Sequence, residues 1–246
     1  MTNTIKAKDV QSKKAKAFIS FILDESGSMS VGRETIVKGM NEQIQTLKSR
    51  FKDGLVEPVV SFVKFADNVI TLYEGKPIDN LREFEIMGYN PNGSTALYDA
   101  VGATIDMMEK MEGINDEGNS ALLIVITDGE ENASKKFNSK QIAEKIQTLQ
   151  GTKKWTITYL GPNNVDLSKV NKTTQISYGN LYSTDLTSAR GYTMAFNAVN
   201  VGLNNWISGS YCAATSGCSF SSDSFYGDNT GTYAATDADK IVGSTK

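Results

Sequence analysis

Residues 18–28 read F-I-S-F-I-L-D-E-S-G-S, and this stretch decides the fold class. Its first six residues, Phe18 to Leu23, are almost continuously apolar, as is typical of a parallel strand that is covered on both faces. The apolar run stops at Asp24, and a polar loop follows. Beyond the loop, apolar residues recur with the period of an amphipathic helix: Ile36, Val37, Met40, Ile44 and Leu47. The stretch therefore predicts a strand, a polar turn and a helix.

The rest of the chain repeats this alternation. Two apolar runs at 59–65 and 69–73 are separated by A-D-N, a spacing that predicts a hairpin and an antiparallel edge of the sheet. Further strands are predicted at 121–127, 155–160 and 176–178. Further helices are predicted at 97–111, 142–149 and 185–206. The sequence thus predicts a doubly wound α/β fold, with a mostly parallel sheet flanked by helices.

The two ends of the chain differ from this central part in composition. Residues 1–17 are polar and lysine-rich, so we expect a solvated arm. Residues 207–246 are rich in Ser, Gly and Thr, with too few apolar side chains for a second core, so we expect a tail. The alternative for this tail is an adhesive segment that becomes ordered on a partner. The predicted domain is 18–206.

The composition excludes several classes of chemistry. The chain has no histidine, which removes Ser-His-Asp and Cys-His nucleophile systems, His-ligated zinc and imidazole pH switches. A net charge of -3 gives no field that favours nucleic acid or an acidic membrane, so neither is expected as a partner. Cys212 and Cys218 fit no zinc motif; they are either two free thiols or the ends of a small disulfide loop.

No stretch of the sequence predicts insertion into a membrane or secretion. The run Phe18 to Leu23 is shorter than the roughly 7–15 residues of a signal-peptide core, and no other run approaches the ~18 apolar residues of a membrane span. The expected location is therefore the cytoplasm, or a particle assembled there.

Oxygen-bearing side chains gather where the predicted strands and loops lead into helices. Asp24, Ser26 and Ser28 follow the first strand, Thr95 precedes a helix, and Asp128 follows the most apolar strand. If those two strands are neighbours, their carboxyl ends place both carboxylates at one crevice of the sheet. Two carboxylates and three hydroxyls favour Mg²⁺ or Mn²⁺ over zinc, and they leave an octahedral ion with an open coordination position.

Other acidic residues lie near these five, and the sequence leaves their roles open. Asp99 either orients a metal ligand or favours the first turn of its helix. Glu25, Glu130 and Glu131 either tune the surroundings of the metal or are ordinary solvated loop carboxylates.

D-E-S-G-S, at residues 24–28, resembles the D-x-S-x-S element of the metal-ion-dependent adhesion site of von Willebrand factor A domains. Thr95 in G-S-T-A-L-Y-D-A resembles the separate threonine of that site, and Asp128 in I-T-D-G-E-E-N resembles its final aspartate. The resemblance covers about residues 18–206. It implies a Rossmann-like sheet of six strands in the order 3-2-1-4-5-6, with a partner carboxylate completing the metal shell. With short predicted loops and no predicted signal peptide, the chain resembles intracellular bacterial or phage members of the family, such as tellurium-resistance proteins.

Three functions remain in view. The first is a protein–protein interaction module, not an enzyme, that binds an Asp or Glu of a protein partner through Mg²⁺ or Mn²⁺. The second is a structural component of a larger assembly, such as a virus particle. The third is a Mg²⁺-dependent phosphohydrolase that uses Asp24 as phosphoryl acceptor, although Ser26 stands where that arrangement needs a second acid. The oligomeric state is left open.

Overall fold

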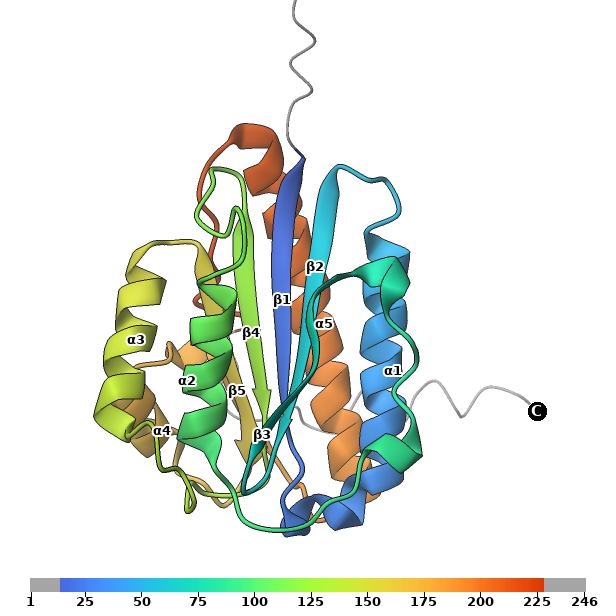
Figure 1. Ribbon diagram of the computed structural model, residues 1–246, viewed down its shortest axis with the longest axis vertical. Helices are drawn as coiled ribbons and strands as arrows, with labels where there is room; N and C mark the ends of the chain where they lie inside the picture. Colours follow the sequence, from blue (N-terminus) through green and yellow to red (C-terminus); the bar gives the residue numbers. More distant parts are fainter. Residues whose placement is uncertain (1–13, 228–246) are drawn as a thin grey trace, which may run out of the picture.

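A six-stranded sheet runs through the centre of the molecule, as the computed structural model in Figure 1 shows. The structure describes residues 14–227; for Ile86 it describes the backbone alone. The strands are β1 Ala15–Asp24, β2 Val56–Phe65, β3 Val69–Pro77, β4 Ser120–Ile126, β5 Trp155–Pro162 and β6 Leu181–Thr184. Their order is β3-β2-β1-β4-β5-β6, and all neighbours are parallel except the antiparallel pair β2 and β3. The predicted α/β fold, strand order and antiparallel edge are confirmed.

Helices cover both faces of the sheet. They are α1 Arg33–Arg50, α2 Leu97–Met108, α3 Ser139–Gly151, α4 Leu167–Thr174 and α5 Ala189–Ser216. Short 3-10 turns lie at η1 Gly27–Gly32, η2 Ile78–Asn80, η3 Ile86–Gly88 and η4 Tyr178–Asn180. Helices α1 and α5 pack on one face, and α2, α3 and α4 pack on the other (Figure 1). None of the described helices is long and apolar enough to cross a membrane.

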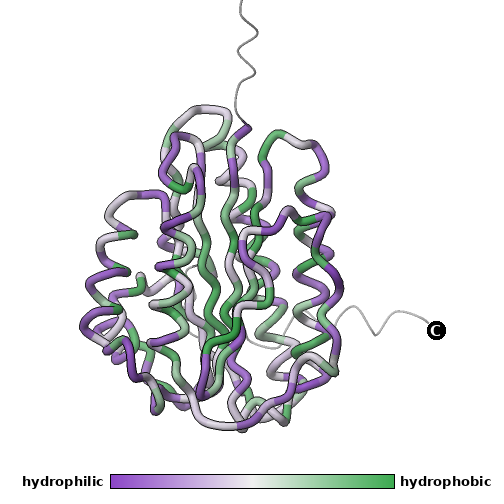
Figure 2. The backbone as a smooth tube through the Cα atoms, viewed as in Figure 1, coloured by the Kyte–Doolittle hydropathy of each residue, from purple (hydrophilic) through white to green (hydrophobic). Residues whose placement is uncertain are grey.

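Strand β1 explains why the opening stretch is so apolar. Ile19 and Phe21 point to the layer of α1 and α5, whereas Phe18 and Ile22 point to the layer of α2 and α3. All four side chains are almost fully buried. The central strands are therefore mainly apolar, while the helices alternate between apolar and polar residues (Figure 2).

Successive strands are added on one side of β1 up to β3 and on its other side from β4 onward, so the order of the sheet switches between β1 and β4. These strands are direct neighbours, with Leu23 opposite Ile126. The helix after β1 is α1 on one face, and the helix after β4 is α3 on the opposite face. In open α/β sheets the crevice for ligands opens at such a point, beyond the carboxyl ends of the strands.

The last strand and the helix before it differ from the sequence-based expectation. The strand predicted at 176–178 is wrong: β6 spans Leu181–Thr184, and Tyr178 begins a 3-10 turn. Ile176 is buried, which explains its apolar character, but it lies in a loop. Helix α4 was not predicted because none of its residues is fully buried, so no strong apolar stripe marks it.

The tail predicted from residue 207 is wrong for residues 207–227. Helix α5 continues to Ser216, and the segment after it returns to the core, where Phe225 and Tyr226 are buried. Glycines on α5 make room for this segment: a Cβ on Gly202 would lie 2.3 Å from the ring of Phe225, and one on Gly209 would lie 2.1 Å from the ring of Phe220. Glycine, which suggested a flexible segment in the sequence, here provides a close packing contact.

The remaining expectations for the chain ends are only partly covered by the structure. Strand β1 begins at Ala15, so residues 15–17 belong to the sheet rather than to the predicted arm. Residues 1–13 and 228–246 lie outside the described residues. Cys212 and Cys218 are free and exposed, so the alternative of a small disulfide loop is not formed.

Candidate metal-binding site

The loop that leaves β1 folds back on the carboxylate of Asp24. This carboxylate is fully buried; its Oδ1 accepts the backbone N–H of Ser26 at 2.7 Å, and its Oδ2 accepts the hydroxyl of Thr127 at 2.6 Å. The carbonyl oxygen of Asp24 accepts the hydroxyl of Tyr89 at 2.7 Å. The Asp24 side chain is therefore held in one orientation at the end of its strand.

Asp128 joins this loop from the end of β4. Its Oδ1 accepts the hydroxyl of Ser28 at 2.6 Å, and the oxygens of Ser26 and Ser28 are 3.2 Å apart. Its Oδ2 accepts the hydroxyl of Tyr192, at the start of α5, at 3.2 Å. Asp24, Ser26, Ser28 and Asp128 therefore lie in one connected hydrogen-bond network.

Thr95 completes the group from the loop before α2. Its backbone pairs with Asn132: the N–H of Thr95 donates to Oδ1 at 2.8 Å, and the N–H of Asn132 donates to the Thr95 carbonyl at 3.0 Å. A Cβ on Gly129 would lie 3.1 Å from Oγ1 of Thr95 and 3.9 Å from Oδ2 of Asp24. Both oxygens therefore border the same small space, and glycine at 129 keeps it open.

The structure thus brings together all five residues that the sequence singled out. We call Asp24, Ser26, Ser28, Thr95 and Asp128 the oxygen cluster. Among residues 14–227 no three Asp, Glu, Cys or His side chains group closely enough to hold a metal, so any ion bound at the oxygen cluster depends on hydroxyl ligands.

The neighbouring glutamates are structural rather than solvated, with one exception. Glu131 accepts the backbone N–H groups of Tyr98, Ala133 and Ser134 at 2.7–2.9 Å, which ties the loop after β4 to the start of α2. Glu25 forms an ion pair with Lys64 at 2.9 Å and is 7% exposed. The expectation of solvated loop carboxylates is therefore wrong for these two residues, whereas Glu130 is exposed.

Asp99 has a role that neither sequence-based alternative describes. Its carboxylate accepts the backbone N–H groups of Lys135, Lys136 and Phe137 at 2.8–2.9 Å, so it fixes the loop that leads into α3. Burial raises the pKa of Asp99, but these hydrogen bonds outweigh burial and hold the pKa below its ordinary value of 3.8.

We expect Asp99→Asn to lower the free energy of unfolding by about 1–3 kcal/mol at pH 7, because an amide cannot accept all three N–H groups. The wild-type advantage is present above the pKa of the unfolded chain and is lost as the pH falls through the lower folded pKa. Urea unfolding at pH 7 and at pH 3 checks this. Equal stability of the two proteins at pH 7 would contradict the role.

The electrostatics of the oxygen cluster favour a cation. Burial raises the pKa of Asp24 to about 6, against the lowering effect of Thr127 and Ser26, and burial also raises the pKa of Asp128. In the described part of the chain, no lysine or arginine forms an ion pair with either carboxylate. A buried carboxylate at Asp24 and a half-buried one at Asp128 are costly without a countercharge, and a divalent ion would reduce that cost. The donor set, all oxygen, fits Mg²⁺ or Mn²⁺.

Sequence reasoning missed two residues that position the cluster. Thr127, which binds Asp24, stands next to Asp128 at the end of an apolar strand, and a hydroxyl at that place is a detectable signal. Tyr192 binds Asp128 from a residue 64 positions later in the chain, and nothing local marks it. Tyr192 lies within the helix predicted at 185–206, and its ring is buried.

Comparison with known proteins agrees with this geometry. The family model described as von Willebrand factor type A domain matches residues 19–191. No curated protein matches the chain in sequence. Several solved structures share the fold at low sequence identity, and at such identity the likeness shows the fold alone.

Three of these structures illustrate the kinds of protein that share the fold. Proximal thread matrix protein 1 from the mussel byssus is 16% identical with a TM-score of 0.50, over 82% of this chain and 47% of that chain. The vWF domain of the type V pili tip protein Mfa5 from Porphyromonas gingivalis is 8% identical with a TM-score of 0.55, over 80% and 97%. The pilus adhesin SpaC from Lactobacillus rhamnosus GG is 13% identical with a TM-score of 0.55, over 77% and 30%. The chain thus spans less than half the length of two of these three.

Proposed function

Because the chain belongs to the von Willebrand factor type A domain family, we propose that it is a protein-binding module in which the oxygen cluster holds one Mg²⁺ or Mn²⁺ ion. Domains of this family generally bind protein ligands, often through a divalent metal. The ion would supply positive charge and an open coordination position for a carboxylate of the partner. The proposed partner residue is an Asp or Glu.

The observation that carries the proposal is that the buried Asp24 and the half-buried Asp128 lie together without a countercharge among the described residues. Ser26, Ser28 and Thr95 would bind the ion directly as neutral ligands and the two aspartates would act largely through water, so the inner shell would neutralise only part of the ion's charge. The hydrogen bonds from Thr127 and Tyr192 orient those aspartates from behind. A third anionic oxygen, from outside the chain, is then a favourable ligand.

The comparisons are compatible with an adhesive role. The names of two similar structures describe a pili tip protein and a pilus adhesin. We propose the same class of activity, adhesion or scaffolding, for this domain, and a place in a larger assembly as the alternative. A cytoplasmic location remains part of the proposal, as does the absence of catalysis. If the wild type hydrolysed a phosphoester and Asp24→Ala did not, the proposed absence of catalysis would be contradicted.

We expect Thr95→Ala to reduce Mg²⁺-dependent capture of the partner at least about tenfold, because it removes a neutral ligand from a site that has few. The measurement is a pull-down from the native source in Mg²⁺ and in EDTA, with quantification of the proteins that depend on Mg²⁺. Thr193→Ala, on the exposed side of α5, is the matched control. Capture that is undiminished in EDTA would rule out a metal-dependent module.

A further inference from the structure

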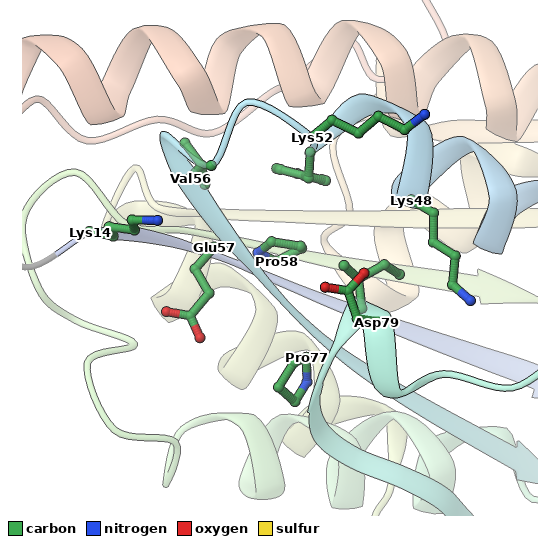
Figure 3. Close-up of a pocket in the computed structure, with 11 residues that line it drawn as sticks. Lys14, Lys48, Lys52, Val56, Glu57, Pro58, Pro77 and Asp79 are labelled. Carbon is green, nitrogen blue, oxygen red and sulfur yellow. The ribbon is translucent and has the colours of Figure 1, made fainter.

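Two cavities of ligand size lie at opposite ends of the sheet. One, of about 380 Å³, is at the amino ends of β1 and β2, and residues of both charges line it: Lys14, Lys48, Lys52, Glu57 and Asp79 (Figure 3). Its charges are mixed, and nothing there points to one ligand. The other, of about 330 Å³, opens at the carboxyl end, between α2, α4 and the loop after β4. We call this second cavity the α2–α4 cavity.

The α2–α4 cavity borders the oxygen cluster. Gly129 is part of its wall, and the space over Gly129 is also bordered by Thr95 and Asp24. A molecule bound at the cluster would therefore lie beside the part of the cavity wall that Gly129 forms. The position suggests a second contact for the same ligand.

The inside of the cavity is mainly apolar. Its wall includes the side chains of Leu97, Tyr98, Tyr159, Val165 and Val170. A smaller void of about 20 Å³ lies against four of its lining residues and is bounded by core residues such as Val101 and Ile157. The floor thus continues into the hydrophobic core. Such a mostly apolar cavity of a few hundred Å³ is typical of sites that enclose a side chain or small ligand.

Two tyrosine hydroxyls give the cavity a polar feature. Tyr159 is only 5% exposed, and the tip of its ring lies over Gly161, where a Cβ would come within 2.5 Å of the hydroxyl. Within residues 14–227, neither this hydroxyl nor that of the half-buried Tyr98 forms a hydrogen bond with another residue. Neither hydroxyl is among the fully buried polar atoms that lack a partner in the described residues, so both are accessible from the cavity and can pair with the polar tip of an occupant.

Charge limits the occupant further. Glu130 and Glu131 line the cavity, with Lys169 as the cationic residue of its wall. Together with Asp24 and Asp128 they make an acidic residue unfavourable there. The acidic side chain of a partner would therefore go to the metal, and an uncharged side chain would enter the cavity.

We propose that the α2–α4 cavity is a specificity subsite that accepts a large aromatic side chain, Tyr or Trp, of the same protein partner whose carboxylate binds at the metal. The inference rests on the proposed function. The aromatic rings of Tyr98 and Tyr159 and the aliphatic wall suit an aromatic ring, and the two free hydroxyls suit its O–H or N–H group.

A displayed peptide library tests the subsite. Each short peptide carries a fixed central Asp between random positions, and selection uses the full chain in Mg²⁺. We expect binders that are lost in EDTA and that carry Tyr or Trp at one fixed spacing from the Asp. Thr173→Trp, which fills the cavity from α4, should bind these peptides about tenfold or more weakly. Lys172→Trp, on the same helix but outside the cavity, should bind them as the wild type does.

The outcomes separate the two proposals. The increase in Tm that Mg²⁺ produces should be the same in wild type, Thr173→Trp and Lys172→Trp, because none of these changes touches the oxygen cluster. Binders that need Asp and Mg²⁺ but show no aromatic preference, or that bind Thr173→Trp unchanged, would overturn the subsite alone. A library that yields no binder dependent on Asp and Mg²⁺ would overturn the proposed function and the subsite with it.

Discussion

Replacing Asp24 with asparagine should stabilise the metal-free protein by roughly 3 kcal/mol at neutral pH and should remove its response to Mg²⁺. Burial raises the pKa of Asp24 to about 6, from 3.8 in an exposed chain. The folded state therefore holds a proton that the unfolded state has lost, and wild-type stability in EDTA falls as the pH rises from about 4 to 6. The asparagine variant lacks this loss, so the two proteins should differ above pH 6 and agree near pH 4.

The local hydrogen bonds allow this substitution. The Oδ1 of asparagine can accept the N–H of Ser26, as that of Asp24 does. Its amide can donate to the oxygen of Thr127, whose hydroxyl then turns to the carbonyl of Gly129, 3.3 Å away. No buried group loses its partner.

Urea unfolding of both proteins, in EDTA and in excess Mg²⁺, checks this prediction. At about a hundredfold excess over Kd, the ion should add about 2.7 kcal/mol to the wild type and nothing to the variant. Asp79→Asn, at an exposed residue, is the control for loss of a negative charge. If Asp24→Asn is less stable than wild type in EDTA at pH 7.5, our description of the site is wrong.

Ending the chain after Trp206 should prevent stable folding, although the sequence suggested a domain boundary there. The truncation removes the last turns of α5 and the buried side chains of Ile207, Phe225 and Tyr226. Each such side chain contributes about 1.5–3 kcal/mol through burial. Their sum approaches the about 5–15 kcal/mol of a whole domain.

A chain that ends after Gly227 is the matched control and should unfold cooperatively with nearly the wild-type Tm. Circular dichroism and thermal unfolding distinguish the two truncations. A cooperative transition in the chain that ends after Trp206, close to that of the wild type, would show that the segment 207–227 contributes little to the core.

The sequence was sufficient to place the oxygen cluster because each of its parts follows a strong local signal. Asp24 and Asp128 directly end the two most apolar runs, and adjacent parallel strands bring such residues to one edge of the sheet. Thr95 has a weaker signal: it was singled out because it precedes a predicted helix, and the family resemblance then supported its grouping with the aspartates. The structure then shows it beside Gly129 and Asp24.

The failures have a common cause, which is that polar or glycine-rich segments gave no periodic signal. The four residues of β6, L-Y-S-T, are too few to show alternation. Helix α4 buries no residue completely, and α5 beyond Trp206 mixes glycine and serine with buried positions. In both helices, tertiary packing stabilises a structure whose local pattern is weak.

Calorimetric titration of Mg²⁺ into the metal-free full chain tests the central claim most directly. We predict one ion per chain, with binding lost in Asp128→Ala while the circular dichroism spectrum of the folded protein is kept. Absence of binding to the wild type, or binding that Asp128→Ala leaves unchanged, would contradict a metal site at the oxygen cluster.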